Sequence, residues 1–258
     1  MVPLLLAPLA ALATKGFPLP LMGFNTCNVG CGNFSFPNEA FVIRTAEAMV
    51  KLGLKDAGWG YVNLDDGWAA VQRSPAGQQV AVPRKFPNGM ASLAAKVHGL
   101  GLRFGLYTAL ASQTCGGMYM AGAGSCNNEV TDALQYSNWS VDYLKDDGCG
   151  GCHGNASDPA LASYAAMQTG ITESGRHIYL TTEASPNLTR HAERPDLYGN
   201  SHRTGHDSQP AWGSVMTQMD IASNLWGMAH NDTGKIAAAA DCGRTRTPCK
   251  RLCADAGN

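Results

Sequence analysis

Hydrophobic residues recur along this chain with two different periods. Short apolar runs typical of buried strands lie at residues 21–24, 61–64, 104–107, 141–145 and 178–182, with a weaker one near 197–203. Between these runs the spacing is helical, which predicts helices over residues 38–52, 90–100, 159–173 and 211–228 and near 128–138. This alternation predicts an α/β protein with a parallel sheet, either closed into a barrel or doubly wound.

Polar residues follow nearly every predicted strand. They are Asn25, Asp65, Asp66, Asp146, Asp147, Glu183, Arg203 and Asp207. In a barrel the carboxyl ends of all strands meet at one mouth, so these side chains would share a site. No GxGxxG motif follows the first strand, which disfavours the dinucleotide-binding form of a doubly wound sheet. We therefore predict a (β/α)8 TIM-type barrel over residues 14–228, incomplete because about six βα units are visible.

Composition and charge narrow the class of partner. The chain of 258 residues is 45% hydrophobic and 15% charged, which is typical of a globular protein with a sizeable core. Its formal net charge of -1 gives no electrostatic attraction for nucleic acid or an anionic membrane, so neither is expected as a partner. No apolar run reaches the ~18 residues of a transmembrane helix, and we expect no membrane span. A small neutral ligand fits these properties.

Both ends of the chain differ from the barrel pattern. Residues 2–13 are apolar and end in Ala11-Leu12-Ala13, so residues 1–13 are a possible signal peptide. Five glycosylation sequons and nine cysteines also favour an oxidising compartment, and we expect a secreted or lumenal protein of the secretory pathway or vacuole. The odd number of cysteines leaves at least one without an intrachain partner. Residues 229–258 show no strand period, and we interpret them as an irregular tail, with a frameshift as one hypothesis.

Two of the acids suggest a reaction. Asp147 follows a predicted strand together with Lys145 and Asp146, and Asp207 lies 60 residues later. Adjacent acids at a strand end are most often a solvated turn. On one barrel mouth, however, Asp147 and Asp207 would form the carboxyl pair that glycoside hydrolysis needs, with one attacking the anomeric carbon and the other protonating the leaving oxygen.

Several segments, in order and spacing, resemble the α-galactosidase (melibiase) family, glycoside hydrolase family 27. The resemblance runs from about residue 20 to about residue 228, and its strongest segments are Tyr61–Trp68, Phe86–Gly89, Gly105–Tyr107, Gln113–Cys115, Val141–Lys145 and Asn200-Ser201 with Arg203-Thr204.

The resemblance implies a function and a role for each aligned residue. It implies a retaining exo-α-galactosidase that acts on terminal α-linked galactose of oligosaccharides or glycoconjugates, with Asp147 as nucleophile and Asp207 as acid/base. It implies no metal or organic cofactor. The substrate-binding residues that it implies are Phe24, Asp65, Asp66, Cys115, Lys145, Glu183 and Arg203. It also implies a disulfide between Cys115 and Cys149, and on weaker grounds one between Cys126 and Cys152.

Some positions depart from the family pattern and leave alternatives open. Phe24 stands at a Trp position, Ala109 at an Asp position, and Gly67 at a Cys position whose usual partner aligns with Cys31, a candidate free thiol. Asp146 replaces an aromatic residue and puts a second negative charge beside Asp147, which would raise one carboxyl pKa unless Lys145 offsets it. The alternatives are a catalytically impaired, truncated relative, or an enzyme for α-N-acetylgalactosamine or β-L-arabinopyranose. Glu183 and Asp66, respectively, disfavour the last two. The sequence does not indicate the oligomeric state.

Overall fold

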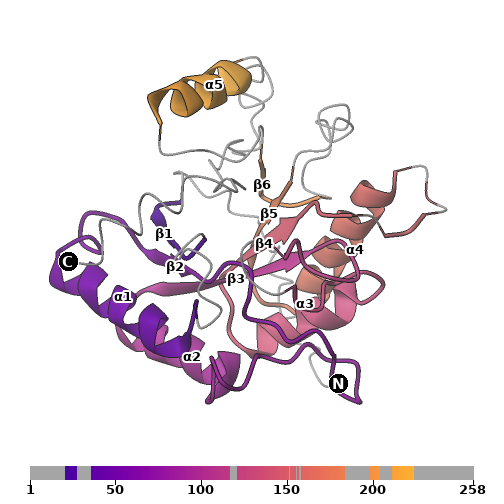
Figure 1. The fold of residues 1–258 in the computed structure, drawn as a ribbon, viewed down its shortest axis with the longest axis horizontal. Coiled ribbons are helices and arrows are strands. Elements are labelled where there is room, and N and C mark those ends of the chain that lie inside the picture. The colour runs from indigo at the N-terminus through magenta and orange to yellow at the C-terminus, as the bar shows by residue number, and fades with distance from the viewer. Residues whose placement is uncertain are drawn as a thin grey trace, which may run out of the picture.

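A six-stranded parallel sheet forms the centre of the computed structural model (Figure 1). The model describes residues 21–27, 36–116, 121–150, 152–154, 156, 158–183, 198–203 and 211–223. The strands are β1 (Gly23–Asn25), β2 (Tyr61–Asn63), β3 (Arg103–Ala109), β4 (Tyr143–Asp147), β5 (Tyr179–Thr182) and β6 (Ser201–His202).

The order of the strands distinguishes a barrel from a doubly wound sheet. Each strand pairs in parallel with the next one in the sequence, from β1 to β6. A doubly wound sheet reverses this order at a switch point, whereas a barrel never does. The predicted incomplete barrel is therefore confirmed.

The helices between the strands cover one face of the sheet, and a further helix follows β6. They are α1 (Glu39–Lys51), α2 (Gly89–Gly99), α3 (Glu129–Asn138), α4 (Pro159–Glu173) and α5 (Trp212–Ser223). Figure 1 shows α1 beside α2 and α3 beside α4, with α5 apart from these pairs. Gly170 permits the α3–α4 contact, because a Cβ there would lie 2.7 Å from the Cβ of Ala133. Within the described ranges, no helix has both the length and the apolar character needed to cross a membrane.

Side chains alternate between the two faces of the sheet. The even-numbered strand residues Val62, Phe104, Leu106, Leu144 and Leu180 are almost fully buried in the main core. The odd-numbered residues Tyr61, Tyr143 and Tyr179 form a separate aromatic cluster at the amino ends of their strands, and the rings of Tyr143 and Tyr179 stack with centroids 5.9 Å apart. Further along β4 the same parity places Lys145 and Asp147 on this second face, towards the carboxyl ends.

The helices and strands predicted from the sequence lie close to the observed ones, and the bounds of the fourth strand differ most clearly. Asn38 caps α1 by accepting a hydrogen bond from the Phe41 N–H at 2.9 Å, and Pro159 lies in the first turn of α4, as expected. The fourth strand was predicted over residues 141–145 but spans Tyr143–Asp147, because its ladder with β3 continues to the pair of Ala109 and Asp147. Asp147 therefore belongs to the strand itself.

Disulfides join the loops that follow β3 and β4. Cys115 pairs with Cys149 and Cys126 pairs with Cys152, with Cα atoms 5.3 and 5.4 Å apart respectively. Cys27 is also disulfide-bonded. The expectations for Cys31, for the possible signal peptide and for the tail at 229–258 lie outside the described residues.

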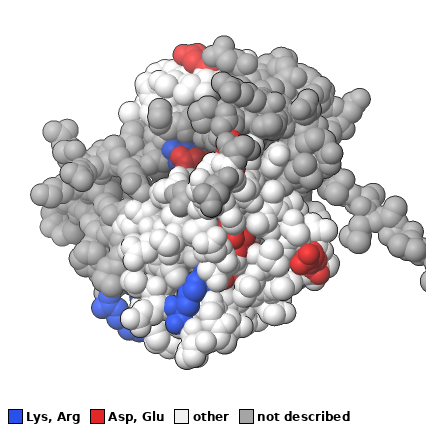
Figure 2. All heavy atoms as spheres, turned by 90° about the vertical axis from the view of Figure 1, so that its right-hand side faces the viewer, with Lys and Arg blue, Asp and Glu red and all other residues white. Residues whose placement is uncertain are grey.

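Charged side chains on the described surface do not gather into a patch of one sign on the face shown in Figure 2. Acidic and basic groups there are scattered over a mostly uncharged surface. This distribution agrees with the small net charge of the sequence.

Candidate active site

One lysine connects carboxylates from two strands at the carboxyl end of the sheet. The ammonium group of Lys145 on β4 lies 3.2 Å from Asp65 Oδ2, just after β2, and 3.9 Å from Asp147 Oδ2. All three side chains are nearly buried, with 6 to 12% of their surfaces exposed. The fold therefore brings together three of the residues that the sequence selected, around a single positive charge.

Asp147 is held in its ionised form. The Tyr107 hydroxyl donates to Asp147 Oδ2 at 2.7 Å, and the Gly148 N–H donates to Oδ1 at 3.1 Å. The Cys115 sulfur touches Oδ2 at 3.1 Å. Burial acts to raise the pKa of Asp147, but the Lys145 charge and the Tyr107 hydrogen bond, together with Glu183 and the Arg203 charge, outweigh burial and hold the pKa below the usual value for an aspartate. A carboxylate kept ionised in a nearly buried position is suited to nucleophilic attack.

Glu183 lies next to Asp147 and shares one of its donors. The Gly148 N–H donates to Glu183 Oε2 at 2.6 Å, and Arg203 Nη1 lies 3.7 Å from Oε1. Burial and the neighbouring Asp147 carboxylate together raise the pKa of Glu183 above its usual value. The pKa values of these two adjacent carboxyl groups are thus shifted in opposite directions, and Asp147 is the more acidic of the two.

Asp66 occupies a tight turn after β2. Its Oδ1 accepts from the Gly67 N–H at 2.6 Å and its Oδ2 accepts from the Gly116 N–H at 3.0 Å. The Thr26 hydroxyl accepts from the Asp65 N–H at 2.9 Å and ties the turn to the end of β1. Burial raises the pKa of Asp66 to about 6, although hydrogen bonds to this carboxylate act in the opposite direction.

Two of the sequence-selected residues do not join this group. Phe24 is even-numbered on β1 and therefore faces the helices, where its ring lies 6.3 Å from that of Phe41 on α1. The interpretation of Phe24 as a substrate-binding residue is not supported by this placement, because it packs against the core on the face opposite Lys145. Asp207 lies outside the described residues.

The side chain of Asp146 points to the opposite face of the sheet from that of Asp147, although the two acids are adjacent in the sequence. It lies on the helix-facing side of β4, is fully buried, and neither of its carboxylate oxygens has a hydrogen-bond partner. Its acidic neighbours there are Glu129 and Asp132 on α3, which are paired with His153 and with Arg73. Burial, with the added repulsion of these acids and Asp147, raises the pKa of Asp146 well above the usual value. Of these two adjacent acids, Asp146 thus has the raised pKa, while the Lys145 charge helps to keep the pKa of Asp147 low.

We expect the variant Asp146→Asn to stabilise the protein at neutral pH. Because the pKa of Asp146 is higher in the folded state than in the unfolded state, the folded state binds more protons, and folding weakens as the pH rises above the ordinary range of aspartate. The gain in the free energy of unfolding, measured by urea denaturation, should therefore increase as the pH rises above the ordinary pKa range of aspartate. Glu47→Gln, an exposed acid on α1, is the matched control. A gain that is independent of pH would contradict this account.

The Tyr107 hydroxyl is expected to help set the lowest pH at which any activity that depends on ionised Asp147 persists. Tyr107→Phe removes the hydrogen bond to the carboxylate, so the pKa of Asp147 should rise and the acid limb of the kcat/KM profile should move to higher pH. Tyr61→Phe makes the same change at the opposite end of the strands and should leave the limb in place. An unshifted limb in Tyr107→Phe would show that the hydroxyl does not control this ionisation.

The contacts of Tyr107, Thr26 and Gly148 were not predicted from the sequence. For Tyr107 a signal was present, because Gly105 and Tyr107 share the parity of the mouth-facing residues along β3. A Cβ at position 105 would lie 2.0 Å from Asn63 Oδ1, so glycine there makes room for the neighbouring strand's side chain. The loop amides and hydroxyls that hold Asp65 and Asp147 carry no comparable signal.

The described residues offer two groups with the spacing of metal ligands, and neither suits a metal ion. One consists of Cys115, Asp147 and Cys149, and the other of Glu129, Cys152 and His153. All three cysteines are in disulfides, which removes the thiolates that a metal would bind.

Comparisons of sequence place this chain among known proteins. The profile of the family described as Alpha galactosidase A (Melibiase_2) matches residues 21–257. A probable α-galactosidase of Dictyostelium discoideum is 34% identical over 204 residues, covering 78% of this chain and 49% of that protein. The chain thus spans about half the length of the curated relatives it matches.

Solved structures agree with the sequence comparison. α-Galactosidase I from Mortierella vinacea superimposes with a TM-score of 0.67 at 31% identity, covering 76% of this chain and 48% of that one. The α-galactosidase of Saccharomyces cerevisiae, solved with raffinose, gives a TM-score of 0.65 at 31% identity and covers 75% of this chain and 41% of that one. On its fold, its barrel mouth and these matches, the chain belongs to the alpha-galactosidase A (melibiase) family of glycoside hydrolases.

Proposed function

We propose that this chain carries the active site of a retaining exo-α-galactosidase that hydrolyses terminal α-linked galactose from oligosaccharides or glycoconjugates. The observation that carries the proposal is the Asp147 carboxylate, which Lys145 and Tyr107 keep ionised at the barrel mouth. The raffinose complex of the yeast relative supports a galactoside as the class of substrate.

Asp147 acts as the nucleophile in this proposal. One of its oxygens bonds to the anomeric carbon while the bond from that carbon to the leaving oxygen breaks, and Asp207 gives the leaving oxygen its proton. In the second step water attacks the anomeric carbon, gives a proton back to Asp207 and releases Asp147. The two displacements retain the configuration of the sugar. No step needs a metal or an organic cofactor.

The remaining mouth residues bind the sugar in this proposal. Asp65 and Asp66 accept hydrogen bonds from galactose hydroxyls, and Lys145 and Arg203 donate to its oxygens. Glu183 lies beside the 2-hydroxyl, where a carboxyl group leaves no room for an acetamide. This arrangement favours galactose over N-acetylgalactosamine.

Hydrolysis of nitrophenyl α-galactoside by the purified chain tests the proposal, with nitrophenyl α-N-acetylgalactosaminide and nitrophenyl β-galactoside as comparison substrates. We expect turnover of the α-galactoside alone, with α-galactose as the first product in an NMR time course. β-Galactose as the first product would reject the retaining mechanism. Absence of turnover and of galactose binding would reject the function for this chain.

We also propose that the protein is secreted or lumenal. The two disulfides, Cys115–Cys149 and Cys126–Cys152, suit an oxidising compartment. Tryptic mapping of the native protein with and without reductant tests this proposal, since a cytosolic protein would yield free thiols at these four positions.

A further inference from the structure

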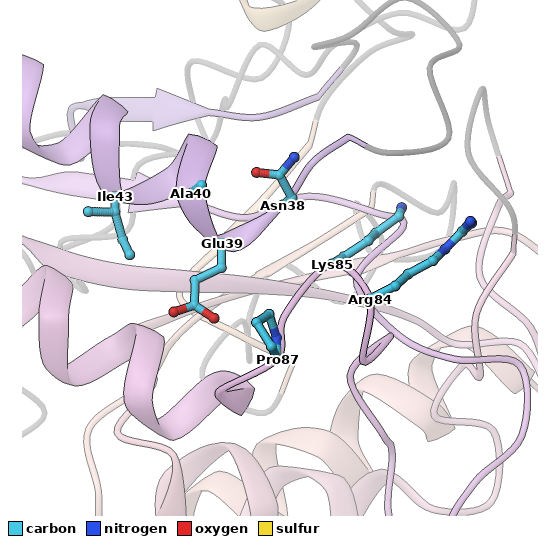
Figure 3. Close-up of a pocket in the computed structure, with 7 residues that line it drawn as sticks. All are labelled: Asn38, Glu39, Ala40, Ile43, Arg84, Lys85 and Pro87. Atoms are coloured by element: carbon cyan, nitrogen blue, oxygen red, sulfur yellow. The ribbon is translucent and has the colours of Figure 1, made fainter.

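Lys85 is a buried cation outside the group of sequence-selected residues. Only 6% of its surface is exposed, and its ammonium group donates to the Gly67 carbonyl at 2.8 Å and to the Phe36 carbonyl at 3.1 Å. It lines a cavity of about 600 Å³ beside the start of α1, shown in Figure 3, where it leaves the same loop as Arg84. Burying an ammonium group is costly unless acceptors replace its water, so these two carbonyls define where the group lies.

The two carbonyls belong to neighbouring loops at the barrel mouth. Phe36 precedes α1 in the connection from β1, and Gly67 lies in the turn after β2. Gly67 has a φ of +92°, a conformation that favours glycine. Lys85, which lies in the β2–α2 connection, therefore joins its own connection at Gly67 to the β1–α1 connection at Phe36.

Gly67 links Lys85 directly to Asp66. Its carbonyl accepts from Lys85, while its N–H donates to Asp66 Oδ1 at 2.6 Å. Lys85 is itself anchored, because its own carbonyl accepts from the Glu39 N–H at 2.9 Å at the start of α1. Through their hydrogen bonds, Lys85 and Gly67 thus connect the first turn of α1 to the carboxylate of Asp66.

The charges of Lys85 and Asp66 also attract each other. Burial and the charge of Arg84 lower the pKa of Lys85, and the Asp66 carboxylate opposes them. The attraction is mutual, so the Lys85 charge also favours the ionised form of Asp66.

We propose that Lys85 is a positioning residue for Asp66: by tying the Gly67 and Phe36 carbonyls together, it fixes the turn from which Asp66 binds the sugar. This proposal rests on the proposed function for the role of Asp66. Lys85 does not touch the substrate, and it acts only through the turn.

The test compares Lys85→Met with Lys96→Met. Lys96 pairs with Glu39 at 2.6 Å in the same part of the fold, but its side chain is 45% exposed and its ammonium group bonds Glu39 rather than the Asp66 turn. We expect Lys85→Met to raise KM for nitrophenyl α-galactoside roughly tenfold, about the loss of one charge-assisted hydrogen bond, with a smaller change in kcat. Lys96→Met should leave both constants unchanged. Equal effects of the two variants would overturn the proposal.

A second readout does not depend on hydrolysis. Selective carboxyl-carbon labelling follows the titration of Asp66, whose pKa is raised by burial to about 6, and Asp66→Asn assigns its signal. Lys85→Met should move this titration to higher pH, and Lys96→Met should not. If the titration moves but the unaltered chain shows no activity, the proposed function fails and the positioning role stands. If Lys85→Met does not fold, Lys85→Gln replaces it, and an unmoved titration together with an unchanged KM overturns the proposal.

Discussion

Replacing Asp147 with asparagine is expected to lower kcat for nitrophenyl α-galactoside by about four orders of magnitude or more. The amide keeps the size of the side chain but is not nucleophilic, so the covalent step of the proposed mechanism would be lost. The fold should be retained, because Asp147 contributes through hydrogen bonds at the mouth rather than through core packing. The measurement is initial rate at saturating substrate, with far-ultraviolet circular dichroism as the check on folding.

The control for this variant makes the same chemical change elsewhere. Asp56 is exposed in the connection between α1 and β2, and Asp56→Asn should have the activity of the unaltered chain. If Asp147→Asn keeps more than about a hundredth of the activity, another group is the nucleophile, and Glu183 would be the next to replace.

Replacing Trp68 with alanine is expected to lower the free energy of unfolding by about 3–5 kcal/mol. Only 1% of Trp68 is exposed, and its indole N–H donates to the Tyr107 carbonyl at 2.8 Å while its ring meets that of Trp139 edge to face. Alanine would leave a cavity and an unpaired buried carbonyl. Urea denaturation measures the change from the midpoint and slope of the transition.

Trp212 provides a matched control for this prediction. It lies on α5 with 75% of its surface exposed, so Trp212→Ala should change the free energy of unfolding by less than about 0.5 kcal/mol. Trp68→Phe should fall between the two, since it keeps an aromatic ring but loses the N–H donor. Equal unfolding midpoints for Trp68→Ala and Trp212→Ala would contradict the core position of Trp68.

The fold could be predicted from the sequence because the hydrophobic periodicity and the polar residues at the strand ends both indicated a barrel. Each predicted strand coincided with an observed one to within a few residues, and polar residues at the ends of β2, β4 and β5 led to the barrel. Strand ends were less predictable. Val141 belongs to the apolar run of the fourth strand, but β4 starts at Tyr143 and extends through Asp147, because pairing with β3 decides the boundary rather than local hydrophobicity.

The candidate site was only partly predictable. Asp65, Lys145, Asp147 and Glu183 were selected as charged residues at strand ends, and the structure brings them within hydrogen-bonding or ion-pairing reach of shared partners. The opposite orientation of Asp146 follows from strand alternation, yet two adjacent acids suggested one local charge. The long-range contacts of Lys85 depend on how the β1–α1 and β2–α2 connections meet, which no local pattern encodes.

The alternation along β4 restricts how this chain can vary. Deleting one residue ahead of Lys145 would exchange the two faces of the remaining strand, so that the Lys145 ammonium group and the Asp147 carboxylate would point into the helical layer and Asp146 would take their place. Two-residue changes, or changes in the loops beyond the strand, would preserve the orientation. Among related chains we therefore expect length differences to accumulate in the connecting loops, while each central strand keeps its number of residues.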